Sequence, residues 1–553
     1  FRSACALAAV THRASTSAAS RSALALPCRA KARCLAAITR ARTAALGSPS
    51  GCDSNNGSGT AGTSTSPILT RTGSMDVLAG GTAYIQEQNG LTVGRGGVDL
   101  NSAPGTQVVL NVNGTSIDSS GGAIVDRGSG TLLVQASGNL TLETTLTSQQ
   151  GNITVTTGGQ LLDGTTGEAS LLSAPNGTVT ITAQGGIGAA GAGDIDFTAA
   201  VITATTTSGG LHLQTGSSTT VGGAGLAVGS GSGALALEVT SGNLTVSSAV
   251  TQSGSGTLSL TTPAGSLNAS GTITTGSGSL TLTAGGSLTT GALAATAGGA
   301  ILLTSVSSGL TVGSATTGGV MTFTAPGTLT LGNLTGGAGA ITLTSTSGTI
   351  ALNGSLSVTS GAIALTAFQS LTVGTLTSST GNITLTSTQG ALTLGSATTA
   401  GTISLQSAGL LTTGALSGQA LSLQSGAGLT ATGTLTTSTG ALALTAAGNV
   451  NLATVQSTNG GAITLTSTAG TLGFGSLSTT GAITLQSAGT LTLGALTGGA
   501  GAVSLRSTAG SVVTTAALST TSAELRLESA TTLQISHNLT TGTGALVLVS
   551  SAG

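Results

Sequence analysis

The chain has 553 residues, of which 91 are glycine, 5% are charged and 1% are aromatic, and its formal net charge is -1. No charged residue, histidine or cysteine occurs between Glu238 and Arg506, so this long stretch lacks the groups needed for acid–base catalysis and for most metal sites. Lys31 is the only lysine, and the shortage of basic side chains also excludes phosphate recognition, and hence nucleic acid as a partner, for the same stretch.

The first segment of the chain differs from the rest in composition. Eight of the thirteen basic residues lie between Arg2 and Arg42, and all four cysteines precede residue 53. The cysteine spacing fits no paired metal motif, although an even number would permit disulfides in a secreted chain. We interpret residues 1–71 as a disordered or processed leader and linker rich in Ala, Arg and Ser. No segment of the sequence is long enough to cross a membrane as a helix.

The second segment, residues 72–207, has the alternating pattern of half-buried strands, but with irregular spacing. It also carries most of the acidic residues. We expect it to form irregular β-solenoid coils. The candidate core positions are Tyr84/Ile85, Leu91/Val93, Val108 to Leu110, Leu132/Val134, Ile153/Val155 and Val179/Ile181.

Asp194 and Asp196 form a close carboxylate pair in this segment. Alternation places both on the outward face of a strand. A calcium site is one interpretation, but we expect no third carboxylate nearby, so we favour a solvated loop or strand edge. His212 and His537 read as isolated surface residues. The sequence therefore singles out no catalytic residue, no cofactor-binding residue and no metal ligand.

The third segment, residues 208–553, is a regular repeat. The pair Ile463/Leu465 returns as Ile483/Leu485 and again as Val503/Leu505, a period of about 20 residues that is typical of solenoids. Each period contains three short apolar clusters separated by Gly, Ser and Asn, which favour turns. The other anchor pairs are Leu211/Leu213, Leu235/Leu237, Leu258/Leu260, Leu280/Leu282, Ile301/Leu303, Met321/Phe323, Ile341/Leu343, Ile363/Leu365, Ile383/Leu385, Ile403/Leu405, Leu421/Leu423, Leu442/Leu444, Leu525/Leu527 and Leu546/Leu548.

These features predict an all-β fold, a right-handed parallel β-helix with triangular coils of about 20 residues. Equivalent strands of successive coils would pair in parallel about 4.8 Å apart, so that 17 coils form a rod of roughly 80 Å. Charged side chains stacked at that spacing would repel one another, which accounts for their absence. A disordered Gly/Ser-rich linker is the alternative, and the in-phase apolar pairs argue against it.

Several Asn-x-Thr triplets precede predicted strands. They match the acceptor pattern for glycosylation, but Asn is also the residue expected where the chain turns into a strand, and we favour turns. Five examples begin at Asn139, Asn152, Asn243, Asn333 and Asn382.

The segment GTAYIQEQNGLTVG at residues 81–94, the GGIG at 185–188 before Asp194 and Ile195, and the repeated Gly-x-Ile-Thr-Leu-Thr-Ser units resemble the passenger repeats of filamentous haemagglutinin-like and autotransporter adhesins of Gram-negative bacteria. The resemblance implies a secreted or outer-membrane-associated protein, exported by outer-membrane machinery, that contacts host or neighbouring-cell surface molecules or matrix. The chain has no Asn-Pro-Asn motif and ends in repeat sequence, so we expect a truncated array, open to end-to-end self-association.

Three functions are compatible with these patterns. The first is a structural or adhesive, non-catalytic exoprotein. The second is an ice-binding solenoid using outward Thr-x-Thr pairs such as Thr342/Thr344 and Thr464/Thr466, although pairs such as Ser404/Gln406 interrupt that array. The third is a polysaccharide-degrading β-helix, confined to residues 76–196 where acids occur.

Overall fold

The recurring apolar pairs lie on short strands, and each strand pairs in register with the equivalent strand of the next turn of the chain. In the computed structural model Ile463 pairs with Ile483, and Ile483 pairs with Val503, all in parallel. The structure describes residues 9–12, 52–56, 68–70, 75–79, 84–87, 91–112, 116–119, 123–165 and 167–551. The fold is the right-handed parallel β-solenoid that the repeat predicts, with coils of about 21 residues.

The chain divides into two units, residues 1–276 and 277–553. In the first unit β1 pairs antiparallel with β2, and the later strands pair in parallel. Its strands are β1 (Ala9–His12), β2 (Cys52–Asn56), β3 (Ile68–Thr70), β4 (Met75–Ala79), β5 (Tyr84–Glu87), β6 (Leu91–Leu100), β7 (Gln107–Val112), β8 (Ser116–Ser119), β9 (Ile124–Asp126), β10 (Thr131–Ala136), β11 (Leu140–Leu142), β12 (Leu146–Ser148), β13 (Asn152–Thr157), β14 (Leu161–Asp163), β15 (Leu172–Ala183), β16 (Ile195–Thr206), β17 (Leu211–Thr215), β18 (Thr219–Val228), β19 (Leu235–Val239), β20 (Leu244–Val246), β21 (Val250–Gln252), β22 (Leu258–Thr262), β23 (Leu267–Ala269) and β24 (Ile273–Thr275).

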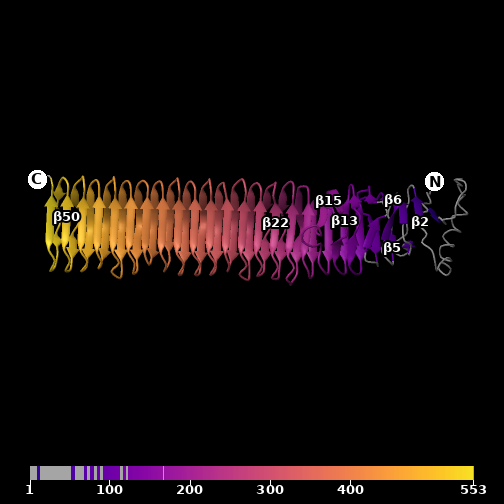
Figure 1. Ribbon diagram of the computed structural model, residues 1–553, viewed down its shortest axis with the longest axis horizontal. Coiled ribbons are helices and arrows are strands. Elements are labelled where there is room, and N and C mark those ends of the chain that lie inside the picture. Colours follow the sequence, from indigo (N-terminus) through magenta and orange to yellow (C-terminus); the bar gives the residue numbers. More distant parts are fainter. Residues whose placement is uncertain are drawn as a thin grey trace. The chain divides into compact units, whose positions relative to one another are not determined.

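In the second unit most coils contain one strand of five residues followed by one of seven to nine residues, and the arrows of successive coils lie next to each other in Figure 1. Its strands are β25 (Leu280–Ala284), β26 (Leu288–Ala295), β27 (Ile301–Ser305), β28 (Leu310–Thr317), β29 (Met321–Ala325), β30 (Leu329–Gly336), β31 (Ile341–Ser345), β32 (Ile350–Val358), β33 (Ile363–Ala367), β34 (Leu371–Ser378), β35 (Ile383–Ser387), β36 (Leu392–Thr398), β37 (Ile403–Ser407), β38 (Leu411–Gly418), β39 (Leu421–Ser425), β40 (Leu429–Thr437), β41 (Leu442–Ala446), β42 (Val450–Ser457), β43 (Ile463–Ser467), β44 (Leu472–Thr479), β45 (Ile483–Ser487), β46 (Leu491–Gly498), β47 (Val503–Ser507), β48 (Val512–Thr514), β49 (Leu518–Thr520), β50 (Leu525–Ser529), β51 (Leu533–Gln534), β52 (Leu539–Thr540) and β53 (Leu546–Ser550).

Each regular coil has three inward faces. In β44 the side chains of Leu472, Phe474 and Leu477 are buried, but the alternation skips at Gly475 and Ser476, which both point outward. Two consecutive outward residues reverse the pleat, so the long strand bends and contributes two faces. In one coil of the first unit the same two faces are separate strands, β20 and β21.

The core is the aliphatic column that the sequence predicts. Every anchor pair from Leu211/Leu213 to Leu525/Leu527 is buried, as are Val108, Val109, Leu110, Leu132/Val134, Ile153/Val155 and Val179/Ile181. Tyr84 is half-buried beside the buried Ile85. Leu546 and Leu548 are exposed, by 43% and 45%. The side chains of Leu91 and Val93 lie outside the described residues.

Buried hydroxyl groups line one corner of the coil, a feature that the sequence analysis missed. The serine at the end of the five-residue strand points inward, and its Oγ donates a hydrogen bond to a backbone carbonyl of the preceding coil. Examples are Ser345 to Gly327 at 2.7 Å, Ser467 to Gly448 at 2.7 Å and Ser507 to Gly489 at 2.7 Å. The hydroxyl thus satisfies a turn carbonyl that no strand partner reaches.

Asn139, Asn243 and Asn382 lie directly before a strand, as predicted, but Asn152 is the first residue of β13 and Asn333 lies within β30, where the prediction of a turn is wrong. Each of the five side-chain Oδ1 atoms accepts a hydrogen bond from a backbone N–H of the next coil. The N···Oδ1 distances are 2.8 Å from Gln160 to Asn139, 2.8 Å from Thr178 to Asn152, 2.8 Å from Ser266 to Asn243, 3.0 Å from Ser355 to Asn333 and 3.0 Å from Thr402 to Asn382. The asparagines therefore link successive coils, at the start of a strand in four cases and within β30 in the case of Asn333.

Most of residues 1–71, including Cys5, Cys28 and Cys34, lies outside the described residues, and the interpretation of this segment as a leader stays a prediction. Within the described ranges, no helix has the length and apolar character that a membrane crossing requires.

Candidate functional site

Two loops interrupt the regular coils in the first unit. One, residues 164–171, joins β14 to β15, and the other, residues 188–194, leads into β16. The second loop turns at Gly188 and Gly191, where positive φ angles of 62° and 74° favour glycine. Hydrogen bonds from Ala189 N to Gly193 O (2.7 Å) and from Asp194 N to Gly191 O (3.0 Å) close the turn. The chain therefore enters β16 with Asp194 held in a fixed position.

Asp194 and Asp196 are buried, with 9% and 5% of their surfaces exposed. Ile195 between them points into the core, so the two acids face outward as alternation predicts. The expectation that they are solvated is wrong, and so is the expectation that no third carboxylate lies near. Glu168, on the 164–171 loop, offers a carboxylate oxygen that lies within 4.8 Å of oxygens from both Asp194 and Asp196.

Gln214 connects these acids to the next coil. Asp196 pairs in register with Gln214 of β17, and Gln214 pairs with Glu238 of β19. The side-chain Nε2 of Gln214 donates to Glu168 Oε2 at 3.0 Å and to Asp194 Oδ2 at 3.2 Å. One amide group therefore holds two carboxylates from different loops.

Glu168, Asp194, Asp196 and Asp163, whose charge acts on both aspartates, form an acidic cluster, and two of its carboxylate oxygens lack hydrogen-bond partners. Asp194 Oδ1 and Asp163 Oδ2 are buried and accept no hydrogen bond. Among the described residues, no hydrogen bond to the Asp196 carboxyl offsets its burial. The sequence has no Lys or Arg between Arg127 and Arg506, and the ion pairs of the described part of the chain involve other acids. The cluster is therefore negative and uncompensated.

The environment shifts the titration of these groups. Burial raises the pKa of Asp196 to about 7, and the charges of Asp194, Glu168 and Asp163 add to the increase. Burial also raises the pKa of Asp194, partly offset by the hydrogen bond from Gln214. Ionising all these carboxyls together is costly, so the cluster holds a proton or needs a cation.

His212 and His537 occupy different environments. His212 lies on the outward face of β17, as predicted, but it is half-buried, and this burial lowers its pKa. It lines, with Asp194 and Glu238, a depression of about 340 Å³. His537 is exposed, as predicted, with Nδ1 3.3 Å from the carbonyl oxygen of Thr514.

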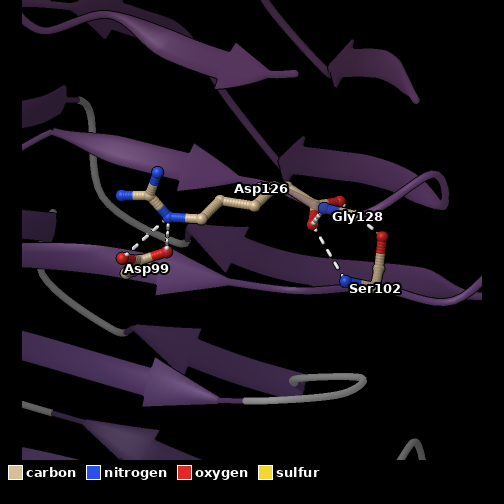
Figure 2. Close-up of polar contacts among 5 residues, drawn as sticks. Asp99, Ser102, Asp126 and Gly128 are labelled. Atoms are coloured by element: carbon tan, nitrogen blue, oxygen red, sulfur yellow. Dashed lines mark hydrogen bonds and ion pairs between the residues drawn. The ribbon is translucent and has the colours of Figure 1, made fainter. Parts of the chain in front are cut away.

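Another buried carboxylate, in a different coil, shows how this chain satisfies such a group without an ion (Figure 2). Asp126, at the end of β9, is fully buried, and its Oδ1 accepts from the backbone N–H groups of Ser102 and Gly128, both at 3.0 Å. Its Oδ2 accepts from the Ser102 hydroxyl. The exposed Arg127 pairs with Asp99 at 2.8 Å. The sequence analysis missed Asp126, although alternation after Ile124 places it inward.

The outward surface of the second unit also carries a hollow. Thr386, Gln406, Gln424 and Thr445 form a column of in-register neighbours on four successive coils. They line a depression of about 500 Å³ together with the serines of the adjoining corner. Its lining side chains are neutral hydrogen-bonding groups or small apolar ones.

Comparison of the chain with family models, with curated proteins and with solved structures finds no match.

Proposed function

We propose that this protein is a structural and adhesive repeat protein without catalytic activity, secreted or held at the outer membrane of a Gram-negative cell. The observation that carries the proposal is the Thr/Gln column of the second unit, a neutral polar hollow in a stretch without charges. Repeated hydroxyl and amide groups at fixed spacing suit polar, uncharged ligands such as the glycans of a cell surface or matrix.

The regular coils also support a scaffolding role. The aliphatic column continues from coil to coil, and hydroxyl corners and asparagine bridges recur at intervals along the stack. The stack therefore maintains a regular display of outward side chains. Partners in this proposal are surface molecules of a host or neighbouring cell or matrix components, reached after export by outer-membrane machinery.

The test combines location and binding. Antibody labelling of intact producing cells should stain the surface or detect the chain in the medium, and cytoplasmic retention would contradict the proposal. Immobilised chain should retain matrix or cell-surface glycans, and the double variant Gln406→Ala/Gln424→Ala should weaken retention. The control is Ser417→Ala/Thr436→Ala, an in-register pair on another face.

The neutral hollow also predicts how binding responds to salt. Coulombic attraction between exposed charges weakens as the screening length falls from about 10 Å at 0.1 M salt to about 3 Å at 1 M. Binding through hydroxyl and amide groups should persist at 1 M sodium chloride. Binding that disappears under that condition would assign adhesion to the charged residues rather than to the Thr/Gln column.

A polysaccharide-degrading activity is the second candidate, and one observation favours it. Asp194 and His212 border the 340 Å³ depression, and buried carboxyls with raised pKa values are common at catalytic sites. Incubation of the full chain with acidic and neutral polysaccharides, with reducing ends as the readout, tests it. Release of reducing ends that Asp194→Asn abolishes would replace the non-catalytic proposal.

Ice binding is the third candidate, and it would need outward threonines of successive coils to stack in register. Thr322/Thr324 pairs with Thr342/Thr344, but Ala364 follows in the same column, and Gln406 and Gln424 interrupt it further along. A flat hydroxyl and methyl lattice therefore extends over few consecutive coils. Measurement of thermal hysteresis in a solution of the chain tests this candidate directly.

A further inference from the structure

We propose that Glu168, Asp194 and Asp196 bind one divalent cation of the calcium type, which fastens the 164–171 loop onto the solenoid. Each residue offers one carboxylate oxygen, and the three oxygens lie within 4.8 Å of one another. Carboxylate oxygens are the ligands that Ca²⁺ prefers, at about 2.3–2.6 Å. Two oxygens on opposite sides of such an ion are therefore up to about 5 Å apart, so this set fits one coordination sphere.

The size of the set favours Ca²⁺ over Mg²⁺. Magnesium needs oxygens at about 2.0–2.1 Å in near-octahedral geometry and retains several waters. Three carboxylates on a strand and a loop form a more adaptable set, which suits the larger ion. Gln214, held against two of the three ligands, supplies a further polar group at the edge of the site.

A second observation, independent of the clustering, points to a ligand. Asp194 is more than nine-tenths buried, and its Oδ1 accepts no hydrogen bond. Asp163 Oδ2, close enough for its charge to act on both Asp194 and Asp196, is likewise buried and unpartnered. Buried carboxylate oxygens without donors are costly, and they are what a bound cation satisfies.

Asp126 provides the internal comparison. This carboxylate is at least as buried, yet backbone and side-chain donors reach both of its oxygens. The chain can therefore satisfy an inward carboxylate through its own turns. Near Asp194 the neighbouring groups include the acids Glu168 and Glu238, whose charges oppose its ionisation, and the sequence has no Lys or Arg between Arg127 and Arg506.

Binding can be measured on the full chain after chelation and desalting. Calorimetric titration with calcium chloride should give one site per chain with Kd on the order of 0.1–1 mM, the range of extracellular calcium modules, and weaker binding of magnesium chloride. Asp196→Asn and Glu168→Gln should each reduce affinity at least tenfold. The matched control is Glu524→Gln, an exposed acid outside the cluster that loses the same charge.

The loop offers a readout that does not depend on heat. A protease specific for glutamyl bonds cleaves after Glu168, and calcium should slow this cleavage at least tenfold because it immobilises the loop. Cleavage after the exposed Glu524 is the internal reference and should not change. Asp196 is buried, so Asp196→Asn could disturb folding. Glu168 is exposed on the loop, so Glu168→Gln tests cation binding without altering the core.

Three outcomes would overturn the proposal. They are an absence of binding up to 10 mM calcium, equal affinity in the wild type and in Glu168→Gln, and calcium protection that is the same at Glu524 as at Glu168. None of these outcomes bears on adhesion, since the Thr/Gln column lies on other coils of the chain.

Discussion

The coils around β16 and the coils around β43 are built on the same inward pattern but differ on their outward side. Around β43 the outward side chains are Thr, Ala and Gln, and each coil pairs with its neighbour in register. Around β16 the outward positions carry Asp194 and Asp196, a loop covers them, and the strand register shifts at Ala174 and Ile202. The coils between Glu238 and Arg506 carry no charge, and most of the acids lie in the irregular coils. Arg506, Arg526 and Glu528, on the in-register strands β47 and β50, are exceptions, and they pair with one another.

The difference follows from the geometry of stacking. A side chain in a strict repeat meets its own copy about 4.8 Å away, so a single charge becomes a column of like charges. An insertion loop breaks that column, and a charge placed there faces different neighbours. The irregular coils therefore provide positions for a chemical site that the regular coils exclude.

The largest expected effect is the loss of the aliphatic column. Ile463→Asp places a carboxylate where the native side chain is fully buried and stacked on Leu442 and Ile483. We expect a local destabilisation of at least about 4 kcal/mol, since the charge has no partner. Hydrogen exchange of the β43 and β45 amides measures it. Thr464→Asp, exposed on the same strand, is the control, and equal exchange in the two variants would contradict the inward assignment.

Next in size is the contrast between the two kinds of buried acid. Asp126→Ala leaves two backbone N–H groups and one hydroxyl without their acceptor and should cost about 2–4 kcal/mol. Asp196→Asn, measured in chelator, removes a charge from a crowded negative cluster and should be neutral or stabilising. Exchange of the β9 and β16 amides compares them. A larger loss for Asp196→Asn than for Asp126→Ala would show that the cluster is satisfied without an ion.

These sites also show how far the sequence alone leads. The period, the inward pairs and the turns at Asn139, Asn243 and Asn382 could be predicted, because each depends on local alternation or turn preference. The partnership of Glu168 with Asp194 and Asp196 could not, because it depends on how an irregular loop folds back over the next coil. The inward Asp126 and the corner serines were within reach of the alternation rule, which was applied only to apolar residues.

A smaller effect is expected at the glycine corner of the regular coils. A Cβ added at Gly361 would lie 1.9 Å from the carbonyl oxygen of Gly339 in the preceding coil. Gly361→Ala should therefore separate two coils locally and cost about 1–3 kcal/mol, the usual range for overpacking. Gly318→Ala is the control, since its nearest atom is 3.5 Å away. Faster amide exchange in β33 for Gly361→Ala alone would confirm the close approach, and identical exchange would contradict it.

The smallest effect tests why the regular surface is uncharged. Gln406 and Gln424 are exposed, in-register neighbours on β37 and β39. Gln406→Glu/Gln424→Glu places two like charges on adjacent strands and should cost about 0.2–1 kcal/mol, less at high salt. Gln406→Glu/Gln424→Lys has the same positions with opposite charges and should be neutral or slightly stabilising. If amide exchange in β37 and β39 is the same in both variants at low salt, stacking repulsion does not explain the missing charge, and selection for an uncharged binding surface becomes the better explanation.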